Sequence, residues 1–73
     1  MDYQKYNSRT PSHKNLEKFR MHNDLTLQNL AEFLGVSREC VRRWEIGLNR
    51  PNIKNALKIE EITNGEVKAR GWL

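Results

Sequence analysis

The chain has 73 residues, one cysteine and a formal net charge of +4. This length allows one small domain, and a single thiol excludes an intramolecular disulfide framework. The sequence contains no apolar N-terminal signal segment and no run near the roughly 18 apolar residues of a membrane span, so we expect a cytoplasmic protein without a membrane partner.

The positive charge is compatible with a polyanionic partner. Lysine and arginine together number 13, against 9 acidic residues. Net charge alone is weak evidence, because many stable small domains are mildly basic. Whether the charge indicates a polyanionic partner therefore depends on where the charged residues lie in the chain.

Residues 1–12 show no periodic apolar pattern and end in Thr-Pro-Ser, which predicts a flexible polar N-terminal arm. Ser12 is a candidate N-cap for a first helix over residues 13–24. In that segment Leu16 and Phe19 lie three positions apart with charged residues between them, as on one face of a helix.

Two short helices are predicted next, separated by a tight turn. Thr26 caps a helix over residues 27–34, whose apolar side chains fall within one arc at about 100° per residue. Gly35 follows directly, where a helix often ends with a positive φ that glycine adopts cheaply. Ser37 then caps a third helix that runs through Trp44, before a glycine ends it.

Pro51 and Asn52 precede a fourth helix over residues 53–63, which an Asn-Gly pair closes. The predicted fold is all-α, with four to five short helices in one domain over residues 13–66. Residues 67–73 form a C-terminal tail that is too short to assign.

The third predicted helix carries its charges on one side. At about 100° per residue, Val41 and Trp44 point inward and Cys40 lies at the edge. The opposite face carries Arg38, Glu39, Arg42 and Arg43. A charged face is usually only a solvated face, but the short preceding helix and the tight turn favour a helix-turn-helix over residues 26–46, in which such a face touches DNA.

Residues 26–51, TLQNLAEFLGVSRECVRRWEIGLNRP, carry a resemblance to a known family. They match every fixed position of the pattern T-x-x-x-L-A-x-x-x-G-V-S-x-x-x-V-x-x-W-E-x-G-x-x-x-P. The segment resembles the lambda repressor-like helix-turn-helix domains of phage Cro and repressor proteins and their bacterial relatives. The resemblance extends over about residues 16–63.

The resemblance implies roles for individual residues. The positions that contact bases are Arg38, Glu39, Arg42 and Arg43. The positions that contact the DNA backbone are Thr26, Gln28, Ser37, Asn49, Arg50 and Arg20. Arg20 and Glu45 correspond to a pair that forms a structural ion pair in family members.

Two departures from the family bear on recognition. Several phage repressors have glutamine where this chain has Leu27, so we expect its phosphate contact to be lost or transferred to Gln28. The three arginines of the third helix suit the O6 and N7 acceptors of guanine, and Glu39 can accept from cytosine. We therefore expect a half-site that contains G·C pairs.

Most apolar residues are expected in the core, which is predicted to contain Leu16, Phe19, Leu30, Leu34, Val36, Val41, Trp44, Ile53, Ala56 and Leu57. His13, His22 and Cys40 lack the close spacing of metal ligands, so no metal or other cofactor is expected. The sequence contains no phosphate-binding loop and no nucleophile with a recognisable base, which argues against an enzyme.

Ile59 and Ile62 are predicted to lie away from the inward arc of the fourth helix, and Trp72 and Leu73 end the chain in apolar residues. Two arrangements of these apolar residues remain open. Either the residues form a dimer contact, or the tail folds back over the isoleucines and completes the core of a monomer. A two-fold homodimer would bind a pseudo-palindromic operator.

The sequence thus predicts a sequence-specific double-stranded DNA-binding transcriptional regulator, a Cro-like repressor that blocks promoters by occupying an operator. The alternative is an antitoxin-type or adaptor protein whose helix-turn-helix mainly binds a protein partner. Three arginines on the third helix suit phosphate better than an apolar partner groove. Nothing in the sequence indicates a small-molecule ligand.

Overall fold

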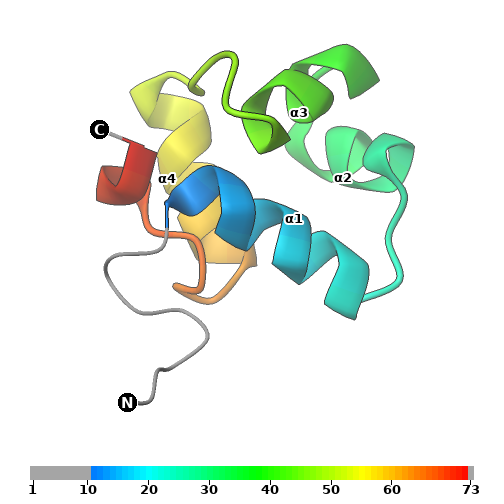
Figure 1. Ribbon diagram of the computed structural model, residues 1–73, viewed down its shortest axis with the longest axis horizontal. Coiled ribbons are helices and arrows are strands. Elements are labelled where there is room, and N and C mark those ends of the chain that lie inside the picture. Colours follow the sequence, from blue (N-terminus) through cyan, green and yellow to red (C-terminus); the bar gives the residue numbers. More distant parts are fainter. Residues whose placement is uncertain (1–10, 73) are drawn as a thin grey trace.

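The computed structural model describes residues 11–72, and the regular elements of this part of the chain are all helices (Figure 1). Its elements are α1 (Ser12–His22), α2 (Leu27–Leu34), α3 (Arg38–Glu45), α4 (Ile53–Ile62) and the short 3-10 helix η1 (Ala69–Trp72). The all-α prediction with four to five short helices is confirmed. Within residues 11–72, no helix is both long enough and apolar enough to cross a bilayer.

Local sequence explains where α2 begins and ends. The hydroxyl oxygen of Thr26 accepts from the backbone N–H of Asn29, and the Asn29 side chain accepts in return from the Thr26 N–H. At the other end Gly35 has φ +71°, and the N–H of Val36 reaches the carbonyl of Ala31 at 3.0 Å. This left-handed ending turns the chain into the next helix within three residues.

The hydroxyl oxygen of Ser37 accepts from the N–H of Cys40 and starts α3, while Asn52 caps α4 in the same way through the N–H of Asn55. The predicted caps Thr26 and Ser37 are confirmed.

The prediction for Ser12 is wrong. Ser12 is the first residue of α1, Pro11 occupies the N-cap position, and no side chain caps the helix there. The Ser12 side chain is buried and donates a hydrogen bond of 2.7 Å to the carbonyl of Lys68. Its hydroxyl therefore joins α1 to the C-terminal segment. The predicted N-terminal arm otherwise lies outside the described residues.

One core joins all five elements. It contains Leu16, Leu30, Ala31, Leu34, Val41, Trp44, Ala56, Ile59, Val67 and Trp72. Phe19 and Val36, which were expected inside, are partly buried and pack against it.

Two predicted core residues are wrong, because α4 is rotated relative to the expectation. Ile53 and Leu57 are 70% and 54% exposed, whereas Ile59 is completely buried. The inward face of α4 is formed by Ala56 and Ile59, and Thr63, directly after the helix, is also buried.

The C-terminal segment folds back over α4 and completes the core. This is the second of the two arrangements that the sequence left open. Val67 is completely buried, and Trp72 is 7% exposed. The N–H of Ala69 donates to a carboxylate oxygen of Glu60 at 2.9 Å, and the N–H of Val67 donates to the hydroxyl of Thr63 at 3.1 Å. Figure 1 shows η1 beside the first turn of α1 and the start of α4.

Candidate nucleic-acid interface

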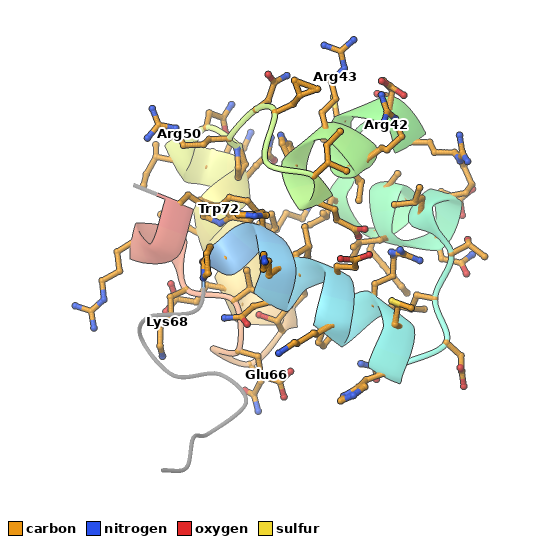
Figure 2. The ribbon with its side chains drawn as sticks, viewed as in Figure 1. Arg42, Arg43, Arg50, Glu66, Lys68 and Trp72 are labelled. Atoms are coloured by element: carbon orange, nitrogen blue, oxygen red, sulfur yellow. The ribbon has the colours of Figure 1, made fainter. Side chains whose placement is uncertain are left out.

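Helix α3 presents a cationic face because its other face is fixed in the core. Val41 and Trp44 are buried, whereas Arg38 and Arg43 are exposed and Arg42 is about half exposed. Figure 2 shows Arg43 extending away from the body of the protein and Arg42 on the outer side of α3. The buried pair thus orients the arginines toward solvent.

Glu39 binds two of these arginines. Its carboxylate accepts from Nε and Nη2 of Arg42 at 3.0 and 2.7 Å, and from Nε of Arg43 at 3.0 Å. The hydrogen bonds from Arg42 and then from Arg43 lower the pKa of Glu39 to about 2. The carboxylate is therefore ionised at neutral pH and offsets part of the positive charge of α3.

The pairing leaves the two arginines unequal. Arg42 is held by both oxygens of Glu39, while Arg43 is held only through Nε and keeps both terminal nitrogens available. This pairing within α3 was not predicted from the sequence. The i,i+3 and i,i+4 spacing from Glu39 was the available signal, since side chains at these spacings are neighbours on a helix.

Arg20 of α1 and Glu45 at the end of α3 are brought together in a two-point ion pair. Nε and Nη2 of Arg20 lie 2.8 and 3.1 Å from the two carboxylate oxygens of Glu45. Nη1 of Arg20 donates to the carbonyl of Leu25 at 3.1 Å. The hydrogen bond to Glu45 is the chief reason that the pKa of Arg20 is raised. Two of the five guanidinium N–H groups are left for a further contact.

The other residues predicted to contact the DNA backbone lie at the starts of α2 and α3 or in the loop after α3. Thr26 and Ser37 are both exposed N-caps, and each hydroxyl keeps its proton for donation. Gln28 donates to Glu32 at 3.1 Å on the surface of α2.

Asn49 and Arg50 are exposed in the loop between α3 and α4. Nη1 of Arg50 donates to the carbonyl of Trp72 at 3.3 Å, so this side chain also contacts the folded-back tail. Figure 2 shows Arg50 extending outward from the loop.

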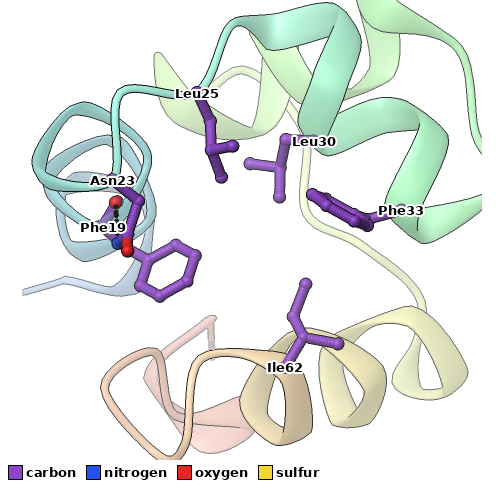
Figure 3. Close-up of a pocket in the computed structure, with 6 residues that line it drawn as sticks. All are labelled: Phe19, Asn23, Leu25, Leu30, Phe33 and Ile62. Atoms are coloured by element: carbon purple, nitrogen blue, oxygen red, sulfur yellow. Dashed lines mark hydrogen bonds between the residues drawn. The ribbon is translucent and has the colours of Figure 1, made fainter.

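A separate apolar groove of about 480 Å³ lies between α1, α2 and α4. Phe19, Leu25, Leu30, Phe33 and Ile62 point toward its centre, with Asn23 at one edge (Figure 3). Phe33 is 61% exposed. This groove could not be predicted from the sequence, since its residues come from three segments that only the tertiary fold brings together.

Comparison with known proteins agrees with this geometry. The helix-turn-helix family model matches residues 16–68, which include most of α1 and all of α2, α3 and α4. The HTH-type transcriptional regulator YqaE of Bacillus subtilis strain 168 is 37% identical over 49 residues, which cover 67% of this chain and 42% of that protein. The chain thus aligns with less than half of this relative. No solved structure matches the chain. With a capped α2, a left-handed glycine turn and an exposed cationic α3, the chain belongs to the lambda repressor-like helix-turn-helix family of DNA-binding domains.

Proposed function

We propose that this protein is a sequence-specific transcriptional regulator of double-stranded DNA, and a repressor of Cro type. The observation that carries the proposal is the exposed arginine face of α3, held outward by the burial of Val41 and Trp44. A helix fits the major groove of B-DNA, where each base pair presents a distinct pattern of donors and acceptors.

Base reading is assigned first to Arg43 and Arg38. Arg43 keeps both terminal nitrogens free of Glu39, and no interaction of the Arg38 side chain is observed within residues 11–72. A free guanidinium end can donate two hydrogen bonds to O6 and N7 of guanine. Arg42 and Glu39 read bases as a pair, and Oε1 of Glu39, which accepts a single hydrogen bond from Arg42, keeps a lone pair that can accept from the amino group of cytosine.

Backbone binding is assigned to residues around α3. The exposed caps Thr26 and Ser37 stand where helix N-termini present N–H groups to phosphates. Further donors are Gln28, Asn49, Arg50 and the two remaining N–H groups of Arg20. Together these contacts fix the position of α3 on the duplex, because phosphate contacts set register and orientation.

Repression follows from occupancy. A protein bound in the major groove at a promoter excludes the polymerase from the same DNA and requires no small-molecule ligand. We propose a pseudo-palindromic operator bound by two copies, whose half-sites lie about one helical turn apart.

The apolar groove supports a second candidate function, binding of a protein partner as in an antitoxin or adaptor. Its lining is almost wholly apolar, and Phe33 exposes a large aromatic surface there. None of the proposed DNA-contacting residues lines it. A Phe33→Ser variant should therefore lose a protein partner and keep DNA affinity.

Selection of binding sites from random duplex DNA tests the first candidate. We expect one recurring half-site with G·C pairs, bound much more weakly by a variant in which Arg38 and Arg43 are alanine. A matched variant with Lys14→Ala and Lys18→Ala removes the same charge from exposed positions of α1 and should retain the site preference. If no sequence is enriched, or if both double variants lose affinity equally, the proposal is wrong.

A further inference from the structure

A second cavity, of about 240 Å³, lies where the start of α1, the loop between α3 and α4, and η1 meet. The polar side chains that line it are those of His13, Asn49, Arg50 and Trp72. Each of them carries at least one N–H group that donates hydrogen bonds. No acidic residue in the described part of the chain lines this cavity, so it suits an anion and not a cation.

The donors of this cavity are largely unused within residues 11–72. Trp72 is 7% exposed, and its buried indole Nε1 has no hydrogen-bond partner there. The side chains of His13 and Asn49 make no hydrogen bond within the same residues. Arg50 donates one of its five N–H groups to the carbonyl of Trp72, at 3.3 Å. Because buried donors in folded proteins almost always have an acceptor, the indole of Trp72 indicates an acceptor from outside this part of the chain.

The N-terminus of α1 lies at the same cavity, since Pro11 and His13 line it. No side chain caps this helix of 11 residues, and its first turn contains no acidic residue. The first N–H groups of a helix have no partner within the helix, and the helix dipole makes this end positive. An anion in the cavity is therefore stabilised by α1 as well as by Arg50.

His13 packs against the loop that follows α3. A Cβ added at Gly47 would lie 3.5 Å from Cδ2 and Nε2 of the imidazole, so the ring occupies the space beside a residue without a side chain. Gly47 has φ +80°, a conformation that favours glycine. Figure 2 shows Trp72 where η1 meets the start of α1, with Arg50 on the neighbouring loop. Three segments far apart in the chain thus bring these donors together around one space.

We propose that this cavity binds a phosphate group. Arg50 provides the positive charge, and the N–H groups of His13, Asn49 and Trp72 bind further oxygens. A phosphate group presents three or more acceptor oxygens in a tetrahedral arrangement, which suits donors that come from different directions, whereas a carboxylate presents two in one plane. At about 30 Å³ for each molecule of liquid water, the cavity has room for several water molecules or for one phosphate group.

The phosphate group has two sources with the same chemistry, the DNA backbone and a free phosphorylated molecule. A duplex phosphate would extend the contact proposed for Asn49 and Arg50 to α1 and η1, and in that case the inference rests on the proposed function. A free phosphate would instead compete with the duplex for Arg50 and weaken DNA binding. This second source goes beyond the proposed function, because it gives the regulator a ligand.

NMR of the full chain without DNA, titrated with sodium phosphate at one pH, tests the cavity. We expect saturable shifts of the Trp72 indole N–H and the His13 imidazole, with a dissociation constant in the millimolar range. Sodium chloride at the same ionic strength should not reproduce them. The chain contains its own references, since His22 lies at the far end of α1 and Trp44 does not line the cavity. Their signals should change no more in phosphate than in chloride.

Two variants link the shifts to the cavity. Arg50→Gln should weaken phosphate binding at least about tenfold, because the charged donor is lost. His13→Ala should weaken it about threefold, since one hydrogen bond is removed. His22→Ala is the matched control, because it removes the other histidine from an exposed position of the same helix and should leave phosphate binding unchanged. Circular dichroism confirms that each variant is folded.

The selected duplex separates the two sources. If the phosphate belongs to DNA, His13→Ala binds the duplex more weakly, and a neutral methylphosphonate at one backbone position removes the difference from the wild type. If the phosphate is free, millimolar phosphate lowers the DNA affinity of the wild type more than that of His13→Ala. Saturable phosphate binding without any selected duplex supports the cavity and contradicts the proposed function. If phosphate shifts all four reference and cavity residues alike, and no duplex distinguishes His13→Ala from the wild type, the proposal is wrong.

Discussion

Glu45, the last residue of α3, accepts two hydrogen bonds from Arg20 of α1 and is 5% exposed at its side chain, against 18% for Arg20. The pair therefore fixes the end of α3 to α1 from a largely buried position. The orientation of α3 depends both on this link and on the burial of Trp44 one residue earlier.

Replacing Arg20 by alanine should lower the free energy of unfolding by about 2 kcal/mol, because the buried Glu45 carboxylate would lose its charged partner. Urea denaturation followed by circular dichroism measures this. A double variant with methionine at both positions should recover much of the loss, since no charge is then left buried without a partner. If the single variant unfolds at the wild-type urea concentration, the pair does not stabilise the fold.

Glu39 should titrate near pH 2, well below its ordinary value of 4.5, because both arginines stabilise its ionised form. With the pKa depressed in the folded state, its contribution to stability is complete above about pH 4.5 and is lost as the pH falls toward 2. NMR titration of the side-chain carboxyl measures this. Arg42→Ala should move the midpoint upward more than Arg43→Ala does, and equal midpoints in all three proteins would contradict the pairing.

Arg43 and Arg50 should affect DNA binding in different ways. Arg43→Ala should relax the preference at one base pair, at a cost of about 1–3 kcal/mol in discrimination. Arg50→Ala should weaken binding to all sequences and flatten the log-log salt dependence by about one unit. Fluorescence anisotropy on selected and random duplexes, over a salt series, distinguishes the two. Identical behaviour of the variants on both duplexes would refute the division of roles.

Two glycines should respond differently to alanine. At Gly35 an added Cβ meets nothing within 4 Å, so only the strain of φ +71° remains, about 1 kcal/mol. At Gly71 the Cβ would collide with the hydroxyl of Ser12, which already donates to Lys68, and we expect about 2–3 kcal/mol from overpacking. Thermal unfolding of both variants checks the order. The reverse order would mean that the tail does not pack on α1.

Ile59 and Leu57 make a matched pair on α4. Ile59→Ala should cost about 3 kcal/mol of unfolding free energy, because this side chain is completely buried. Leu57→Ala should cost below about 0.5 kcal/mol in the monomer, since the side chain is largely exposed. Denaturation at low protein concentration keeps self-association out of the comparison. Equal losses would place Leu57 in the core and contradict the rotation of α4.

Several features of this protein could be predicted from sequence because they depend on residues close together in the chain. The Thr26 and Ser37 caps and the Gly35 turn each involve neighbours within a few positions, so local sequence determines the ends of α2 and the start of α3. The inward positions of Val41 and Trp44 follow from helical periodicity over four residues.

The features that could not be predicted from the sequence depend on contacts between residues far apart in the chain. The role of Ser12 was misassigned because its partner is Lys68, 56 positions away. The rotation of α4 was predicted wrongly because its apolar side chains, Ile53, Leu57 and Ile59, are similar in hydrophobicity. Their types alone do not indicate which of them is buried.

The covering of α4 by the C-terminal segment decides which of those side chains lies inside, through the burial of Val67 and Trp72. Sequence alone therefore determined the helices and the cationic face of α3. Packing between segments far apart in the chain determined which face of α4 is buried and which is exposed, since burial is a property of the assembled core and not of a single residue.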